Sequence, residues 1–301
     1  MGITTDVLVI GGGNAAMFAA LAARRKGASV VLLESATAFM RGGNSRHTRD
    51  IRFMHTTRNR YATGVYSHDE FWEDLMGVTG GQTDENLAER TIRLSEDLPE
   101  WMEENGVRFQ EPLHGTLHLG RTNMFMLGGG RAMVNAYFQS AARLGVQVLY
   151  EAEAEELCIE DGRFTSATFT QGGERRTVSA KAVVVAAGGF EANVAWLKEY
   201  WGDAADNFVI RGSPHNTGKM LKALLAHGSR SVGDPRQFHA VAVDARAPKF
   251  DGGIVTRLDS VPFGIAVNKE GNRFYDEGEN FWPKRYAIWG KLIAGQPGQI
   301  A

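Results

Sequence analysis

The chain has 301 residues, 43% of them hydrophobic, which is enough to bury the core of one large domain or two. Its 33 basic and 35 acidic residues nearly balance, so its overall charge argues against binding to nucleic acid or to an acidic membrane surface. The single cysteine, Cys158, excludes an internal disulfide and fits a reducing cytoplasm. The longest apolar runs fall short of the roughly 20 residues that span a bilayer, and the N-terminus lacks the pattern of a secretory leader. We therefore expect a cytoplasmic protein that does not itself span a membrane.

The first 35 residues contain a glycine knot between two apolar runs. "DVLVI" has the length and composition of a strand that is buried on both faces of a parallel sheet. The chain then turns sharply at Gly11, Gly13 lets a pyrophosphate approach the main chain, and Ala16 keeps the next helix close to the strand. This pattern predicts a strand, a phosphate-binding turn and a helix.

The next residues complete a dinucleotide-binding pattern. A helix is expected over residues 14–26, with Gly27 at its C-terminal end and its positive dipole end directed at the knot. "SVVLLE" is the second strand, and Glu34 lies about 20 residues past the glycines, where a carboxylate can accept the ribose hydroxyls. The alternative is a glycine turn in a βαβ unit without a ligand. The order of strand, knot, helix, strand and acid favours a nucleotide site.

Beyond Glu34 the chain departs from a plain βαβ continuation. A segment rich in Gly, Asn, Ser and Arg is followed by two expected helices. Ser67 and Glu70 form a capping box for the first, and Thr83 is expected to cap the second, which Pro99 should kink or divide. The next expected elements are a helix from residue 131, a strand at 146–150 and a small antiparallel meander over 155–178. A buried strand ending in paired glycines then follows at "KAVVVAAGGFEAN".

Five motifs in order resemble one known family. They are "VIGGGNAA", "GGNS", "VVVAAGGFEAN", "NTG" and "GIAVNKEGNRFYDE". Together they resemble the flavoprotein subunits of fumarate reductases and succinate dehydrogenases. The resemblance is closest to the tricarballylate dehydrogenase branch, which is also similar to the flavin half of precorrin-3B synthase. It implies an α/β fold, with a Rossmann-like FAD-binding domain that carries the meander, followed by the start of an α+β capping domain.

The resemblance implies that FAD is the cofactor. Two glycine-ended strands that converge on one ligand also suit a long, two-ended cofactor. Family members with covalent flavin carry a histidine where this chain has Asn44, and His47 lies three residues too late, so non-covalent FAD is expected. The residues assigned to FAD are Gly11, Gly13, Ala15, Ala16, Glu34, Gly43, Asn44, Ser45, Ala154, Ala187, Gly188 and Gly189.

The chemistry implied by the resemblance is hydride transfer between flavin and a carbon next to a carboxylate. The leading expectation is dehydrogenation of a small polycarboxylate, of the tricarballylate to cis-aconitate type. Arg285, after "RFYDE", is the expected proton carrier, although it lies a few residues later than the usual spacing. His239 and Thr256 fall where the family binds substrate, and the family's glutamate after that threonine is Arg257 here. The alternatives are a surface arginine at 285 and an ordinary histidine at 239.

Substrate specificity is expected to depend on the arginines that follow the glycine pair. Arg41, Arg46, Arg49 and Arg52 put positive charge near the expected flavin, and a tricarboxylate needs more guanidinium groups than fumarate does. Arg49 is the substrate-binding candidate among them. The alternative is a solvated basic loop. No metal site is predicted, because Gly115 argues against a helix that would pair His114 with His118.

The expected domains are an FAD-binding domain over residues 1–234 and a partial capping domain over 235–301. Because the family continues well past "RYAIWG", the sequence resembles the first two-thirds of such an enzyme. We therefore expect these 301 residues alone to be poorly soluble or self-associated, to hold FAD weakly and to turn over slowly. The expected partners are a small polycarboxylate and a separate membrane-bound iron–sulfur or haem electron acceptor.

Three functions stay open at this point. They are a flavin dehydrogenase of the tricarballylate type, the flavin portion of a cobalamin-pathway monooxygenase, and a catalytically silent FAD-binding module. A disulfide-reductase flavoprotein is disfavoured, because one cysteine cannot supply the redox pair.

Overall fold

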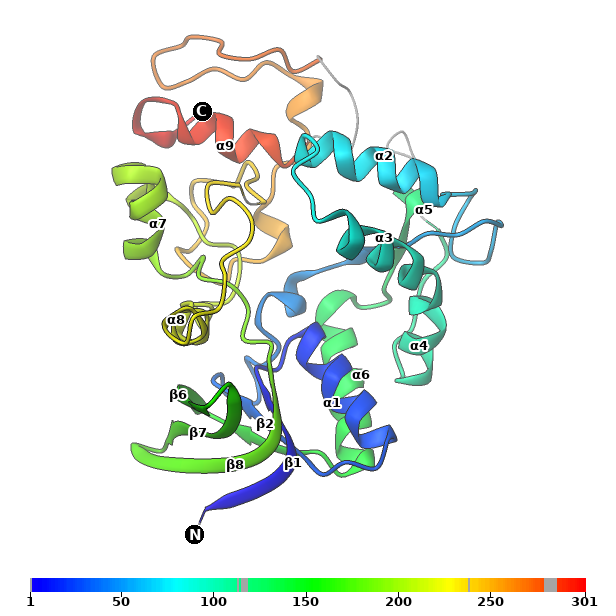
Figure 1. Ribbon diagram of the computed structural model, residues 1–301. Coiled ribbons are helices and arrows are strands. Elements are labelled where there is room, and N and C mark those ends of the chain that lie inside the picture. The colour runs from blue at the N-terminus through cyan, green and yellow to red at the C-terminus, as the bar shows by residue number, and fades with distance from the viewer. Residues whose placement is uncertain (1, 113, 115–118, 238, 279–285) are drawn as a thin grey trace. The chain divides into compact units, whose positions relative to one another are not determined.

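The computed structural model describes residues 2–112, 114, 119–237, 239–278 and 286–301 (Figure 1). The chain divides into two compact units. The first comprises residues 1–188 and 219–233, and the second comprises 189–218 and 234–301. Each unit is described by itself below.

The first unit is built on a six-stranded mixed sheet, with the strand order β5-β2-β1-β8-β7-β6. β1, β2, β5 and the last half of β8 run parallel, with Ile10 opposite Leu33 on one side and Val185 on the other. β6, β7 and β8 form an antiparallel meander. The strands are β1 (Ile3–Ile10), β2 (Val30–Glu34), β5 (Gln147–Tyr150), β6 (Ala152–Glu160), β7 (Arg163–Gln171) and β8 (Glu174–Val185).

Two layers cover the parallel strands of this sheet. α1 (Asn14–Arg25) and α6 (Gly129–Leu144) pack on the face that carries Val9 and Leu32, whereas the meander and α8 (Lys219–Ala226) cover the face of Leu8 and Leu33 (Figure 1). All five residues of β2 are buried. Full burial of each such apolar side chain contributes about 1.5–3 kcal/mol. The continuous apolar runs of the sequence are therefore strands covered on both faces, and the predicted Rossmann-like fold is confirmed.

The strand that the sequence placed at "KAVVV" begins earlier than expected. β8 runs without a break from Glu174 to Val185, so its first half belongs to the meander and its second half to the parallel sheet. The predicted turns at Asp161–Gly162 and Gly172–Gly173 lie between β6, β7 and β8, where these glycines have positive φ angles. The last strand of the meander is therefore also the strand that pairs with β1.

The helical segment between residues 68 and 104 agrees with the expected pattern except at one cap. Ser67 caps α2 (His68–Thr79), as predicted, by accepting the N–H of Glu70. The predicted cap at Thr83 is wrong, because Asp84 caps α3 (Glu85–Leu94) with a carboxylate oxygen 3.0 Å from the nitrogen of Leu87. Pro99 divides the run as predicted, since η2 (Ser95–Asp97) separates α3 from α4 (Leu98–Glu104).

The remaining elements are short. In the first unit, η1 (Gly43–His47) and α5 (Leu119–Thr122) adjoin a two-stranded antiparallel sheet of β3 (Asp50–Arg52) and β4 (Asn123–Phe125). The second unit contains α7 (Val194–Trp201), η3 (Gly202–Asn207), η4 (Ile254–Thr256), η5 (Val261–Phe263), α9 (Ile288–Ala294) and η7 (Pro297–Gln299). In the described ranges, no helix combines the length and apolarity that crossing a membrane requires.

Candidate functional site

The glycine knot lies at the carboxyl ends of β1, β2 and β8. Gly11 has a φ of 108°, and its N–H donates to the carbonyl oxygen of Leu33 over 2.8 Å. A Cβ at Gly11 would stand 2.3 Å from the carbonyl oxygen of Ala186, at the end of β8. The knot therefore has glycine because two strand ends approach each other here more closely than a side chain permits.

Glu34 lies directly behind the knot. Its carboxylate accepts the N–H groups of Ala36, over 2.9 Å, and Gly42, over 3.2 Å, and the residue is buried. A Cβ at Gly12 would stand 2.2 Å from Oε2 of Glu34. The backbone thus fixes the acid against the glycine turn at the end of β2.

The helix α1 begins at this knot. Helical geometry leaves the N–H groups of its first turn, at Asn14, Ala15 and Ala16, without acceptors inside the helix. The Oγ of Ser45 accepts the N–H of Asn14 over 2.9 Å, so η1 is joined to the start of α1. The N–H groups of Ala15 and Ala16 and the positive end of the helix dipole suit a negatively charged group at this position.

A second glycine position holds η1 against the start of α6. The N–H of Gly130 donates to the carbonyl oxygen of Thr48 over 2.6 Å, and a Cβ at Gly130 would stand 2.1 Å from the carbonyl oxygen of Ser45. Gly43, Asn44 and Ser45 are therefore held on a short helix between two helix N-termini.

The structure places most of the remaining predicted cofactor residues in the first unit as well. Ala154 is buried on β6, in the core that covers the β1 and β2 face. Ala187 and Gly188 follow β8 beside the glycine knot, whereas Gly189 begins the second unit. Apart from Gly189, all of the predicted cofactor residues thus belong to one unit.

This arrangement fits a dinucleotide. The turn has no Cβ where a diphosphate approaches, the free N–H groups of α1 face the same place, and a fixed carboxylate follows at the end of β2. Gly11, Gly13, Ala15 and Ala16 would hold the diphosphate, and Glu34 would hold the ribose of the adenosine.

The four arginines that the sequence placed near the flavin all have partners inside the protein. Arg41 donates to the side-chain oxygens of Tyr150 and Asn135 and lies over the ring of Phe138. Arg46 is buried against Met40, and Arg49 pairs with Asp50 over 3.0 Å. Arg52 pairs with Asp74 over 3.5 Å. The substrate role of Arg49 stays a prediction.

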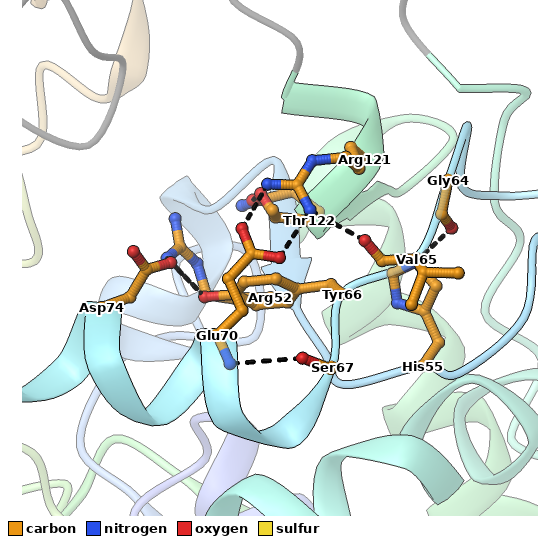
Figure 2. A network of polar contacts seen from close by, with 11 residues as sticks. Arg52, His55, Gly64, Val65, Tyr66, Ser67, Glu70, Asp74, Arg121 and Thr122 are labelled. Carbon is orange, nitrogen blue, oxygen red and sulfur yellow. Dashed lines mark hydrogen bonds and ion pairs between the residues drawn. The ribbon is translucent and has the colours of Figure 1, made fainter.

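Arg52 belongs to a polar network that joins β3 to α2 and α5 (Figure 2). The hydroxyl of the fully buried Tyr66 donates to Asp74 over 2.6 Å and accepts from Arg52 over 3.2 Å. Arg121 of α5 forms a two-pronged ion pair with Glu70 of α2. Glu70, which the capping box would direct to its own helix end, therefore ties α2 to α5. This network is structural, and it fixes the short β3–β4 sheet beside η1.

A cluster of charged and aromatic side chains lies in the second unit. The His239 ring stands 5.3 Å from the Tyr286 ring, and the Arg257 guanidinium lies 4.3 Å from the centroid of the same ring. The side chain of Arg257 is 5% exposed and donates to Asp259 over 2.7 Å. Although His239 reaches solvent, desolvation by surrounding protein atoms, with the charges of Arg211 and Arg257, lowers its pKa to about 4. The imidazole is therefore neutral at pH 7.

Backbone contacts bring this cluster together. Val243 pairs with Arg257 in an isolated antiparallel bridge, and the N–H of Leu258 donates to Ala242. α9 packs on residues 240–241 through Gly290, where a Cβ would stand 2.4 Å from the carbonyl carbon of Ala240. The carbonyl oxygen of Arg211 accepts the N–H of Gly253 over 3.0 Å. Three segments that are distant in the sequence thus meet around His239.

The roles predicted for His239, Thr256 and Arg285 stay predictions. Thr256 lies in η4 next to Arg257, and its hydroxyl donates to the carbonyl oxygen of Gly253 over 2.8 Å. Arg285 lies outside the described residues, as does His118 of the histidine pair. Sequence reasoning missed Arg211 and Tyr286, since neither belongs to a recognisable motif and only the fold brings them to His239.

The model of the family "FAD binding domain" matches residues 6–293 of the chain. The NADH:fumarate oxidoreductase of Klebsiella pneumoniae is 25% identical over 280 residues, which cover 91% of this chain and 29% of that protein. A probable fumarate reductase, Ifc3, of Shewanella frigidimarina is 27% identical over 281 residues, which cover 91% of this chain and 46% of that protein. The chain thus spans less than half the length of these two relatives.

A solved structure shows the same fold. The 3-ketosteroid delta1-dehydrogenase of Sterolibacterium denitrificans superposes with a TM-score of 0.79 at 20% identity, and the match covers 97% of this chain and 66% of that one. The family match extends over both compact units and includes the glycine knot, Glu34 and the cluster around His239. The chain therefore belongs to the FAD binding domain family.

Proposed function

We propose that the chain is the FAD-binding and substrate-anchoring part of an oxidoreductase that acts on a carbon–carbon bond next to a carboxylate. The family match and the two fumarate-reducing relatives support the flavin and the reaction class. The observation that carries the proposal is the cluster of Arg211, Arg257 and His239 in the second unit.

The cluster has the chemistry of a carboxylate site. The Arg257 guanidinium offers fixed N–H donors, and its stacking on Tyr286 restricts its orientation. Asp259 accepts from one nitrogen of that guanidinium, and we propose that the substrate carboxylate binds the remaining donors. A neutral His239 adds one N–H donor without adding charge. The carboxylate is therefore oriented by direction-specific hydrogen bonds, and Thr256 lies beside them in η4.

When bound, FAD would supply hydride transfer. The residues of the chain bind the cofactor through backbone N–H groups and Glu34, and they orient the substrate through the cluster. We propose that FAD is held without a covalent bond, because Asn44 stands at the position of the linkage histidine in the resembling family. Precipitating the loaded chain with acid should release yellow FAD to the supernatant, and flavin that stays in the pellet would refute this point.

The substrate within this class is a further proposal. Arg285 as the proton carrier, a tricarballylate-type substrate and a membrane-bound electron acceptor stay predictions from the resemblance. Fumarate and cis-aconitate distinguish a dicarboxylate from a tricarboxylate substrate, and 1,4-androstadiene-3,17-dione, with which the solved dehydrogenase is in complex, tests the steroid alternative. The cationic cluster favours the acids over the uncharged steroid.

The test is a dye-linked assay of the FAD-loaded chain in two directions. A reduced dye is used with each of these unsaturated compounds, and an oxidised dye is used with their more saturated partners, succinate, tricarballylate and androst-4-ene-3,17-dione. Arg257→Gln should raise KM for the acid that reacts by about 10-fold or more, because a hydrogen bond to a charged group contributes about 1.5–3 kcal/mol. Arg246→Gln is the matched control, since Arg246 is 91% exposed and, among the described residues, pairs with the nearby Asp244. Turnover of the steroid alone, or an unchanged KM in Arg257→Gln, would overturn the proposal.

A further inference from the structure

The first unit contains a cavity that shares no lining residue with the predicted flavin site. It has a volume of about 620 Å³ and lies between the loop 58–63, Glu103 of α4, the segment 108–112, His114 and Leu127. This volume lies within the roughly 300–1,000 Å³ that is usual for small-molecule sites. Neither the glycine knot nor Glu34 contributes to its lining.

Backbone contacts fix the walls of this cavity. The N–H of Leu127 donates to the carbonyl oxygen of Arg108 over 2.8 Å, and Phe109 pairs with Met126, so the segment from 108 extends the edge of the β3–β4 sheet. On the opposite loop, Asn59 accepts the N–H of Tyr61 over 2.8 Å. The rings of Tyr61 and Phe109 lie 5.2 Å apart and form an apolar wall.

Some of the charged side chains that line the cavity have partners in the protein, and others have none among the described residues. The carboxylate of Glu103 accepts from Arg60 over 2.6 Å and from the hydroxyl of Tyr61. The negative charge of Glu103 is therefore paired with side chains of the cavity wall itself. Burial, and then the hydrogen bond to Glu103, raise the pKa of Tyr61 to about 12, and its hydroxyl therefore stays protonated. The guanidinium groups of Arg58 and Arg108 have no hydrogen bond or ion pair within the described part of the chain.

Two unpaired guanidinium groups and an aromatic wall define the ligand class. Guanidinium groups bind carboxylate and phosphate oxygens through paired hydrogen bonds. Three arginines against the two carboxylates of Glu103 and Glu111 leave the lining positive when His114 is neutral. We propose that this cavity binds a small organic or inorganic oxyanion, a carboxylate or a phosphate, through Arg58 and Arg108.

The experiment is a titration of the ¹⁵N-labelled chain with succinate and, separately, with inorganic phosphate. Amide chemical shifts are followed for residues 58–63 and 108–111. These residues are far in sequence from the cluster around His239, so binding of succinate to that cluster is read separately. We expect saturable shifts in both segments with at least one of the two probes, and the tighter probe identifies the source of the oxyanion.

The variant Arg58→Gln/Arg108→Gln should weaken binding at these amides by about 10-fold or more, as the loss of charged hydrogen bonds predicts. Both side chains are exposed and have no partner among the residues that the structure describes, so the exchange leaves the fold intact. Arg163→Gln, an exposed arginine at the start of β7, is the matched control and should bind like the parent. The absence of saturable shifts with both probes, or equal binding by the double variant, would overturn the proposal.

Discussion

The two candidate sites are built by different means. The cradle at the end of β1 consists of backbone groups, missing Cβ atoms and one fixed carboxylate, Glu34. The cluster in the second unit consists of long side chains, Arg211, Arg257 and His239, on segments with little regular structure. A backbone site is sensitive to any added atom, whereas a side-chain site is sensitive to charge. Added atoms should therefore be most harmful at the backbone site, whereas loss of charge should be most harmful at the side-chain cluster.

The largest effect is expected at Gly11. Gly11→Ala places a Cβ 2.3 Å from the carbonyl oxygen of Ala186 in a backbone conformation that alanine rarely adopts. We expect a loss of several kcal/mol in the free energy of unfolding, of which about 1–2 kcal/mol is the left-handed backbone cost, and no measurable flavin binding. Urea unfolding and a flavin titration measure the two effects.

Gly27→Ala separates the clash from the backbone cost. Gly27 has a φ of 86°, yet a Cβ there would meet no atom within 4 Å. This variant should lose only about 1–2 kcal/mol and keep its flavin affinity. Equal losses in the two alanine variants would show that the close approach of β1 and β8 does not matter.

The next effect concerns the carboxylate of the cradle. Glu34→Gln keeps the shape of the side chain but removes its negative charge, so its oxygen accepts hydroxyl and N–H donors less strongly. The affinity for FAD should fall by about 10- to 100-fold, because a charged hydrogen bond contributes about 1.5–3 kcal/mol. Glu160→Gln, at the exposed end of β6, is the control and should bind FAD normally. An unchanged dissociation constant for FAD in Glu34→Gln would show that the Glu34 carboxylate does not bind the cofactor.

The side-chain cluster should respond to charge and pH. The pKa of His239 is lowered from an ordinary value of 6.5 to about 4, first by desolvation and then by Arg211 and Arg257. NMR titration of its ring protons should show this midpoint. In Arg257→Gln the midpoint should rise but stay below 6.5, since desolvation remains. A midpoint near 6.5 in the parent protein would contradict the described cluster.

The same lowered pKa has a consequence for stability. Between pH 6.5 and about 4 the unfolded chain protonates His239 while the folded chain does not, so this residue makes folding less favourable as the pH falls through that window. Above pH 6.5 the contribution is constant. His239→Gln should flatten this part of the pH dependence of the unfolding free energy, and an identical pH profile in both proteins would argue against it.

The smallest effect is expected at Ser45. Ser45→Ala removes the acceptor for the N–H of Asn14 and should cost about 1 kcal/mol in the free energy of unfolding, as at other helix starts. Ser67→Ala removes a similar bond at the start of α2, away from the knot. Both variants should lose comparable stability, but only Ser45→Ala should also weaken flavin binding. Equal flavin affinities of the two variants would show that η1 does not contribute to the flavin site.

The same contrast explains what could be predicted from the sequence. Gly11, the helix after it and Glu34 lie within 24 consecutive residues, so local spacing was enough to predict their arrangement. Arg211 and Tyr286 reach His239 only through backbone pairing between distant segments, which no local pattern encodes. Likewise, periodicity predicted the strands, but not that β8 would run through both the meander and the parallel sheet. The cap at Asp84 was missed because its neighbour Thr83 also belongs to the residue types that cap helices, and one residue separates the two alternatives.

A visible-absorbance titration of the chain with FAD and with FMN tests whether the backbone groups and Glu34 form a dinucleotide cradle. FMN carries the same isoalloxazine ring but has neither the adenosine nor the diphosphate that the glycine knot and Glu34 are proposed to hold. We expect a saturable change in the spectrum of FAD and at least about 10-fold weaker binding of FMN, since the hydrogen bonds to the adenosine ribose and to the second phosphate are lost. Equal binding of the two flavins, or no change with FAD, would contradict it.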